Sequence, residues 1–363
     1  MKKNLVALMC VASIATTAFV GCGSNSTADT TTEQATAEAE TSVEKVDVSN
    51  APVAAEGELL TGIGTSVSTA DSVDATADAD GTAQCDATIA AVTVDSNGAV
   101  VECVIDIAQT KIGVSADGKI TADLDATYPS KRELGDDYGM KKFSAIGKEW
   151  FEQADAFAAW TVGKTAEEIS NMSIEQGLAT DEDLVASVSI HVTGFQAAVL
   201  EAMNNAVAGG AVEGDKLGLG LSTKISNSVD ATADADGTAE AYTTISVLTV
   251  NGDGVITSSL IDAVQGKITF DAKGAITSDT TTEVKSKNEL GDAYGMRAAS
   301  AIGKEWNEQA QAYADYTVGK TLEEVEGTAI EEGRAADADL AASVSIHITD
   351  FNAVIAKAVE SAK

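Results

Sequence analysis

The chain is a tandem duplication, and this feature constrains its fold more than any other. The segment Ser72–Ala83, SVDATADADGTA, returns unchanged as Ser228–Ala239, so that position 72 corresponds to position 228 at an offset of 156 residues. The motifs ELGD, IGKEW and TVGKT recur at the same offset without an insertion between them. Each copy is about 145 residues long, which is enough for its own hydrophobic core. The sequence therefore predicts two similar domains, residues 59–207 and 218–363, joined by a Gly-rich linker over residues 208–217.

The first half of each copy has the pattern of a β-sheet. Two β-rich runs flank Asn97-Gly98, and this dipeptide is the strongest short-range signal for a hairpin. A second, shorter hairpin is expected around Asp117-Gly118. The second copy repeats both patterns as TVNGDGVITSSLID and KITFDAKGAITSD.

The later half of each copy has helical periodicity. In the first copy Gly163 suits the position just after a helix, and Thr165 with Glu168 predicts a capping box for the next helix. A final helix is expected over about residues 194–206. Strands followed by helices predict an α+β fold, in which helices pack on a sheet built from hairpins. The residues that share one face of the predicted helix are Ile146, Trp150, Ala154, Phe157 and Ala158.

The chain begins with the features of an exported protein. Lys2 and Lys3 precede an uncharged, mostly apolar run, Leu5–Val20. A membrane span needs about 20 apolar residues, so this shorter run is typical of an export signal. The run ends in FVGC, which resembles the lipobox of bacterial lipoproteins. This resemblance implies a signal peptide over residues 1–22 and acyl chains, such as palmitate, on Cys22; an ordinary secretory signal or an N-terminal anchor helix are the alternatives.

Residues 23–58 are rich in Thr, Ser, Ala and Glu and contain no aromatic residue. Such a segment cannot bury enough apolar surface to offset the entropy cost of ordering it. The sequence predicts a disordered tether between a lipid anchor in the cell membrane and domains on its extracytoplasmic face. An acyl chain contributes about 0.8 kcal/mol per buried CH₂, so two chains hold stably.

The formal net charge of −34 argues against nucleic acid and anionic lipid as partners, because both repel an acidic protein. An acidic surface that keeps the protein soluble is sufficient to explain this charge. Cys85 and Cys103 are the cysteines that remain after the signal and the lipobox. Pairing of the strands around Asn97-Gly98 would set them on opposite faces and seven residues out of register, which disfavours a disulfide.

Two short motifs suggest chemistry that their spacing does not support. GKT at Gly163–Thr165 is not a phosphate loop, because Ala158 occupies the position of the first glycine. In DATADADG, Asp78 and Asp80 match two positions of a calcium loop, but Ala87 stands where a bidentate Glu is needed. We expect a plain Asp-Gly turn and no metal site, with a weak cation site as the remaining alternative.

The two histidines of the chain lie in a repeated string, DLVASVSIH at Asp183–His191 and DLAASVSIH at Asp339–His347. Alternation over residues 187–192 predicts a strand, with the serines and the histidine on the face opposite the aliphatic residues. His191 and His347 have no Cys or second His nearby in the sequence. We therefore expect solvent-facing or edge histidines rather than metal ligands or acid–base groups.

Over most of its length each copy resembles the FMN-binding domain of bacterial surface lipoproteins. The shared layout is a DGTA start, a strand–turn–strand such as TVDSNGAVVECVID, a YGMKK…IGKEWFEQA helix, and a closing motif before the last helix. In that family the closing motif reads approximately Asp-x-x-Ser/Thr-Gly-Ala-Thr/Ser. A flavin transferase attaches FMN through a phosphodiester bond to the last hydroxyl of the motif.

The resemblance implies that Ser189 and Ser345 hold the flavin phosphate. Ser187 and Ser343 stand where the family has glycine. Covalent attachment, non-covalent flavin binding and loss of the cofactor all remain open. The motif positions fall on Asp183, Ala186, Ser187, Val188 and Ser189 in the first copy, and on Asp339, Ala342, Ser343, Val344 and Ser345 in the second. Four expected loop residues either stack on the flavin ring or pack at a helix edge, namely Tyr138, Met140, Tyr294 and Met296.

In function, the resemblance implies a membrane-anchored, extracytoplasmic electron carrier with one flavin centre in each copy. Its partners would be a flavin transferase and a membrane electron donor, and the flavin itself would supply the redox chemistry. Such a protein is a carrier rather than an enzyme with its own substrate. The alternative is a non-redox surface lipoprotein that acts as a binding or structural, antigenic module.

Overall fold

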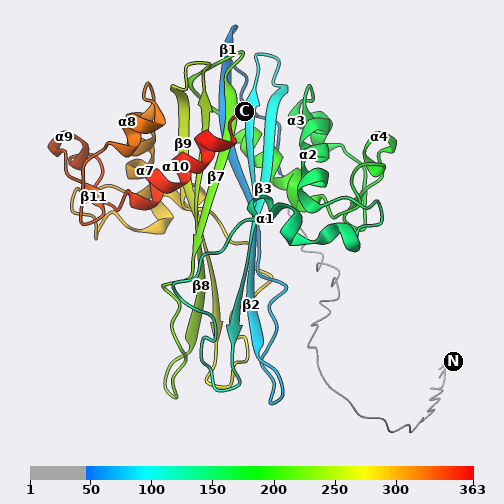
Figure 1. Ribbon diagram of the computed structural model, residues 1–363, viewed down its shortest axis with the longest axis vertical. Coiled ribbons are helices and arrows are strands. Elements are labelled where there is room, and N and C mark those ends of the chain that lie inside the picture. The colour runs from blue at the N-terminus through cyan, green and yellow to red at the C-terminus, as the bar shows by residue number, and fades with distance from the viewer. Residues whose placement is uncertain (1–45) are drawn as a thin grey trace, which may run out of the picture. The chain divides into compact units, whose positions relative to one another are not determined.

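The computed structural model describes residues 46–363 (Figure 1). The predicted signal peptide, Cys22 and the first part of the predicted tether lie outside the described residues. Within the described part, none of the helices is long and apolar enough to cross a membrane. Strands and helices are both present in each copy, and the predicted α+β fold is confirmed.

Each copy contributes one large antiparallel sheet, and the predicted hairpins form. A tight turn at Asn97-Gly98 joins the second and third strands of the first sheet, and Gly98 has φ +74°. The shorter hairpin continues the third strand through a bridge between Val114 and Ile120. The first sheet has the order β3-β2-β1-β6 and the second the order β7-β8-β9. Their strands are β1 (Glu58–Ser68), β2 (Gly81–Val94), β3 (Val100–Val114), β6 (Val207–Val212), β7 (Lys216–Lys224), β8 (Gly237–Val250) and β9 (Ile256–Phe270).

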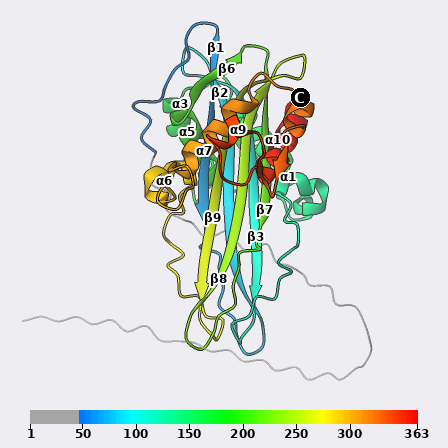
Figure 2. The same ribbon diagram turned by 90° about the vertical axis from the view of Figure 1, so that its left-hand side faces the viewer.

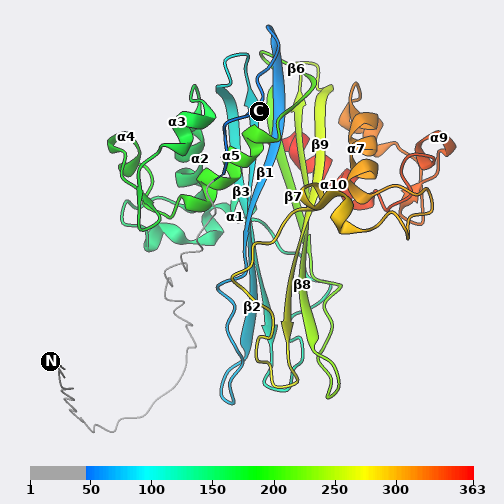
Figure 3. The ribbon, with the colours of Figure 1, turned by 180° about the vertical axis from the view of Figure 1, so that it is seen from behind.

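Two segments predicted to be irregular are parts of the folded structure. The first half of the linker predicted over 208–217 is strand β6, which pairs with β1 and passes beside β9 (Figure 3). The end of the predicted tether also packs on the first copy: Ala54 is buried, and the Asp47 carbonyl accepts a hydrogen bond from Asn204 Nδ2 at 2.7 Å. The composition of these segments does not predict their packing, because a few small or aliphatic side chains are enough to pack a segment against an existing core.

The helices of each copy follow its sheet strands and begin at recognisable caps. Helix α2 starts at Trp150, so Ile146 precedes it, and Gly163 with φ +80° follows its end as predicted. The predicted capping box of Thr165 and Glu168 forms. In the first copy the elements are α1 (Lys131–Leu134), the 3-10 helices η1 (Gly135–Tyr138) and η2 (Met140–Lys142), α2 (Trp150–Thr161), α3 (Ala166–Ser170), β4 (Ile174–Glu175), β5 (Leu178–Ala179), α4 (Glu182–Val185) and α5 (Thr193–Asn204). In the second copy they are α6 (Lys287–Leu290), η3 (Gly291–Tyr294), α7 (Trp306–Thr317), α8 (Leu322–Glu326), β10 (Ile330–Glu331), β11 (Arg334–Ala335), α9 (Ala338–Ala341) and α10 (Thr349–Ser361).

The described residues form four layers, with the two sheets face to face between two groups of helices (Figures 1 and 2). Alternate residues of β2 serve the two faces of its sheet: Ile89 and Ala91 pack against the second sheet, whereas Ala90 and Val92 pack under the helices of their own copy. Because both faces are covered, the middle of this strand, Ile89–Val92, is continuously apolar. One shared core therefore lies between the sheets, and one private core lies under each set of helices.

Small side chains let the sheets approach closely. A Cβ added at Gly266 of β9 would lie 2.2 Å from Cys85 Sγ of the other copy, so only glycine fits there. Among the described residues, Cys85 and Cys103 are free thiols. Cys85 pairs in register with Thr110 and faces the second sheet, whereas Cys103 pairs with Val92 and faces the helices. This confirms the expected offset and opposite faces, and burial raises the pKa of both thiols to about 12.

The identical strings that reveal the duplication hold the two copies together. Asp74 Oδ1 accepts a hydrogen bond from the backbone N of Ile276 at 2.7 Å, and Asp230 Oδ1 accepts one from Ile120 N at 2.9 Å. Backbone bonds from Ala75 N to the Gly274 carbonyl and from Ala231 N to the Gly118 carbonyl, both 2.9 Å long, repeat the exchange. Each string therefore clasps the short hairpin of the other copy.

One contact between the copies differs from the contact at the equivalent positions on the other side of the interface. Lys357 of α10 forms an ion pair with Glu133 of the first copy at 2.5 Å. At the matching place Glu201 of α5 approaches Glu289, and both carboxylates take part in hydrogen bonds with Thr65. Burial, followed by the negative charge of Glu289, raises the pKa of Glu201 to about 8. Asp262 and Glu283 add further negative charge, so one side of the interface is an ion pair and the other is a carboxylate pair.

Replacing Glu201 should remove a pH-dependent cost of folding. Folded Glu201 keeps its proton up to about pH 8, whereas the ordinary value is 4.5, so stability falls as the pH rises between these values. We expect Glu201→Gln to raise the free energy of unfolding at pH 8 by about 2 kcal/mol, less than the full pKa difference implies because the group is partly exposed. Glu201→Lys, which copies Lys357, should raise it at least as much.

Urea unfolding followed by tryptophan fluorescence at pH 5 and pH 8 measures this effect. Glu360→Gln, at an exposed position of α10, is the matched control and should follow the unmodified chain. An equal pH dependence in Glu201→Gln and the unmodified chain would contradict the assignment.

Candidate functional site

A cavity of about 810 Å³ opens in the second copy, between the face of β7 and β8 under the helices and the loops that precede α7 and α10. Its volume lies within the range of about 300–1,000 Å³ that is usual for small-molecule sites. Tyr242 and Thr244 line it from the sheet, Trp306 from α7, and Ser345 and His347 from the segment before α10. The cavity therefore contains one of the two serines selected from the sequence.

A buried cation forms part of the cavity wall. Lys287 Nζ donates a hydrogen bond to the Tyr242 hydroxyl at 2.9 Å. It also lies 4.5 Å from the ring centres of Tyr242 and Tyr294, and 4.7 Å from that of Trp306. The negative faces of these rings attract the ammonium group. Burial lowers the pKa of Lys287 to about 8, so the side chain is mostly charged at neutral pH.

The closing motif forms a loop, and the predicted strand over residues 187–192 is wrong. Helix α4 ends at Val185, and a turn then leads directly into α5. Val188 and Val192 are buried four residues apart, so the aliphatic side chains follow a compact turn rather than a pleat. Among residues 46–363, the non-glycine residues with positive φ are Gln176 and Glu332, so the turn at Ser187 does not require a glycine.

Each candidate serine is held by a buried glutamine. The backbone N and Oγ of Ser345 donate to Gln309 Oε1 at 2.8 and 3.0 Å. Ser189 makes the same two bonds to Gln153, at 2.8 and 3.1 Å. Both glutamines are completely buried in α2 and α7. Because the serine hydroxyl donates to the glutamine, its oxygen lone pairs remain available for a ligand.

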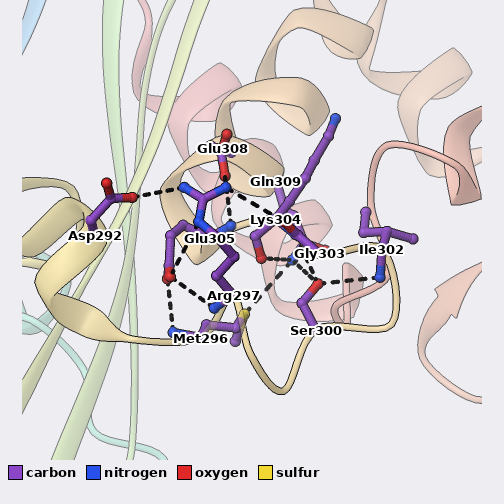
Figure 4. A network of polar contacts seen from close by, with 10 residues as sticks. All are labelled: Asp292, Met296, Arg297, Ser300, Ile302, Gly303, Lys304, Glu305, Glu308 and Gln309. Atoms are coloured by element: carbon purple, nitrogen blue, oxygen red, sulfur yellow. Dashed lines mark hydrogen bonds and ion pairs between the residues drawn. The ribbon is translucent and has the colours of Figure 1, made fainter.

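A polar network fixes Gln309 in turn (Figure 4). Its Nε2 donates to Ser300 Oγ at 3.2 Å and to the Lys304 carbonyl at 3.1 Å. The Glu305 carboxylate accepts the backbone N–H groups of Met296 and Arg297, both at 2.8 Å. These bonds hold the loop over residues 296–305 against the start of α7, so Ser345 rests on a rigid support.

Cationic side chains also lie at the edge of the cavity. Arg334 Nε donates to the Ser345 carbonyl at 2.9 Å, which places an exposed guanidinium next to the backbone of the candidate serine. Lys224 also lines the cavity and forms an ion pair with Asp350. The edge of the cavity therefore offers positive charge beside Ser345.

The aspartates and the other candidate serines selected from the sequence are exposed or half-buried. Asp183 and Asp339 are exposed in the first turns of α4 and α9. Ser187 and Ser343 are half-buried in the turns that follow these helices. The cavity lining includes neither Asp339 nor Ser343.

The candidate ring-stacking residues divide between two roles. Met296 lines the cavity, whereas Tyr294 holds the Lys287 ammonium. In the first copy Tyr138 lies 5.1 Å from Lys131 Nζ, and Met140 Sδ accepts from Gln153 Nε2 at 3.6 Å.

The histidines pack on glycines in the turns of the two-stranded hairpins β4-β5 and β10-β11. A Cβ at Gly177 would lie 3.0 Å from the His191 ring, and one at Gly333 would lie 3.3 Å from His347. His347 is exposed and His191 is half-buried. In the described part of the chain, no group of three or more His, Cys, Asp or Glu side chains is arranged to hold a metal ion.

Sequence reasoning missed the lysine, the glutamine and the arginine of this site. The first residue of α6 is Lys287, and a lysine at a helix start ordinarily points to solvent. Lys131 and Gln153 of the first copy recur as Lys287 and Gln309, but Lys111, Lys148 and Lys164 recur as well, so recurrence alone does not distinguish the buried lysine. Arg334 has no counterpart in the first copy, so recurrence does not mark it either.

Comparisons with known proteins find sequence similarity over a short stretch of the chain. No family model matches the chain, and no solved structure matches it. The chain is similar to a chlorophenol reductase of Desulfitobacterium hafniense, with 52 % identity over 42 residues. This stretch is 12 % of the present chain and spans 13 % of the length of that relative. A match of this extent does not assign a family.

The buried side chain of Gln309 should contribute strongly to the free energy of unfolding. Gln309→Leu would leave the Ser345 N–H and O–H groups without their acceptor, and we expect it to lower the free energy of unfolding by about 2–3 kcal/mol. Chemical denaturation measures the change. Gln311→Leu, which alters an exposed residue two positions along α7, is the control and should change stability by less than about 0.5 kcal/mol. Equal effects of the two variants would show that the hydrogen bonds to Ser345 do not contribute to the free energy of unfolding.

Proposed function

We propose that the protein is a lipid-anchored, extracytoplasmic electron carrier that binds FMN, with the phosphate end of the cofactor at the closing-motif serine. The observation that carries this proposal is the position of Ser345, which lines an 810 Å³ cavity that is also lined by a buried lysine in an aromatic box. A planar, phosphate-ended ligand requires an apolar slot and a polar, cationic end. The cavity offers both.

The residues present fit such a cofactor. Trp306, Phe351 and Met296 supply apolar surface for a planar ring system. The ammonium of Lys287 supplies positive charge, which favours an electron-rich ring or a phosphate. When bound, FMN would supply one- and two-electron transfer, and the protein would bind it, orient it and limit its contact with water. Because the flavin itself would supply the redox chemistry, we propose a carrier rather than a catalyst with its own substrate.

The serine could hold the phosphate covalently or through hydrogen bonds. Gln309 fixes the direction of the Ser345 hydroxyl, and Gln153 does the same for Ser189, so a flavin transferase would meet the same serine geometry in both copies. The similar protein of Desulfitobacterium hafniense is a chlorophenol reductase, which agrees with a redox role, and the similarity covers 13 % of its length. A lipid anchor at Cys22 would keep the carrier near a membrane electron donor.

The test is the visible absorption of the full chain, purified in detergent after co-expression with a flavin transferase. We expect flavin absorption bands, and an added FMN mass on the peptide that contains Ser345 if the bond is covalent. Ser345→Ala should lose the added mass, whereas Ser96→Ala, in an exposed turn, should keep it. A colourless protein that also fails to bind added FMN would contradict the proposal and leave a non-redox surface lipoprotein.

The affinity of the cavity for FMN should fall above about pH 8. Lys287 loses its proton near this pH, and its loss removes a positive charge beside the ligand. The groups around Lys287 are Tyr242, Tyr294 and Trp306 at close range, with Glu240, Lys267 and Asp262 as more distant charges. Fluorescence titration with FMN from pH 6 to pH 9.5 measures the change. Lys287→Met should weaken binding at pH 7 and flatten the pH dependence, and an unchanged pH profile would rule out this role for the lysine.

A further inference from the structure

We propose that the two copies are unequal, so that the second copy holds the phosphate-ended ligand and the first does not. This inference rests on the proposed function, and it concerns which residues select the ligand. The hydroxyl itself does not distinguish the copies, because Ser189 and Ser345 make the same pair of hydrogen bonds to their glutamines. Any difference must come from the side chains around them.

The first difference is at the residue that faces the buried lysine. In the second copy Lys287 donates to the phenol of Tyr242, a neutral side chain. The corresponding residue of the first copy is Asp86, whose Oδ2 accepts a hydrogen bond from Gln84 Nε2 at 2.6 Å. A carboxylate at this place repels a phosphate and removes an aromatic wall.

The second difference lies beside the serine. Arg334 reaches the Ser345 carbonyl through Nε, and its planar guanidinium carries further N–H groups that suit a phosphate. The corresponding residue of the first copy is Leu178, which is 39 % exposed and offers no donor. A phosphate at Ser189 would therefore lack the cation that a phosphate at Ser345 meets.

The balance of charge points the same way. The cavity of the second copy has three cationic side chains, Lys224, Lys287 and Arg334, against one carboxylate, Asp350. At the corresponding positions the first copy has one cation, Lys131, and two carboxylates, Asp71 and Asp86. Since Lys224 and Asp350 pair with each other, the unbalanced cations of the second copy are Lys287 and Arg334. The net charge of these positions is therefore +2 in the second copy and −1 in the first, which favours an anionic ligand in the second copy.

The experiment compares FMN with riboflavin, which lacks the phosphate, by fluorescence titration and calorimetry on the full chain in detergent. The unmodified chain should bind one FMN. Arg334→Leu, which installs the residue of the first copy, should weaken FMN binding about tenfold and change riboflavin binding less than twofold. Arg334→Lys, which keeps the charge, should retain most of the FMN affinity. Leu178→Glu in the first copy is the matched control and should leave FMN binding unchanged.

The outcomes separate this inference from the proposed function. Two FMN molecules bound with equal affinity, an Arg334→Leu variant with unchanged FMN affinity, or a loss of FMN binding in Leu178→Glu would each overturn the inequality of the copies while the flavin proposal stands. Failure of both FMN and riboflavin to bind the unmodified chain would instead remove the flavin proposal. Riboflavin binding by Arg334→Leu shows that this variant is folded.

Discussion

The face-to-face packing of the two sheets is the interaction on which the rest of the structure depends. Each sheet is apolar on both sides, and its own helices cover only one of them. A single copy would leave the other face in water, which costs about 25 cal/mol for every Å² of apolar surface. The second copy removes this cost by supplying a similar apolar face. Small residues such as Gly266 let the sheets approach, and the clasps at Asp74 and Asp230 fix their register. The duplication visible in the sequence is therefore a condition of the fold.

This packing also positions the candidate site, because successive side chains of a strand point to opposite faces of the sheet. In β8, Ala241 and Ile245 face the other copy, whereas Tyr242 and Thr244 line the cavity. A strand held on one face by the shared core presents its other face with little freedom. The aromatic box around Lys287 and the support under Ser345 thus stand on a rigid base. This suits a site that would hold a cofactor in one orientation.

The sequence predicted those parts of the fold that depend on local chemistry. The Asn97-Gly98 turn, the glycine after α2 and the capping box at Thr165 each depend on a few adjacent residues, and each forms. It failed where distant contacts decide the conformation. The segment around Ser189 alternates like a strand, yet Gln153 binds its backbone from another helix and holds it as a loop. Burial of Lys287 likewise depends on aromatic rings from a strand, a 3-10 helix and α7, whose meeting no local pattern reveals.

A duplicated domain can keep its shared contacts and still diverge elsewhere, and both tendencies are visible here. The clasping strings are identical because each must fit the other copy. Positions that do not touch the partner in this reciprocal way are free to differ, as Tyr242 and Asp86 do at the lysine. The contrast between the Lys357–Glu133 ion pair and the Glu201–Glu289 contact shows that even the interface has begun to diverge. Since a single set of shared contacts stabilises both copies, loss of ligand binding in one copy would cost the fold little, and the structure can hold one site while the other copy serves as its support.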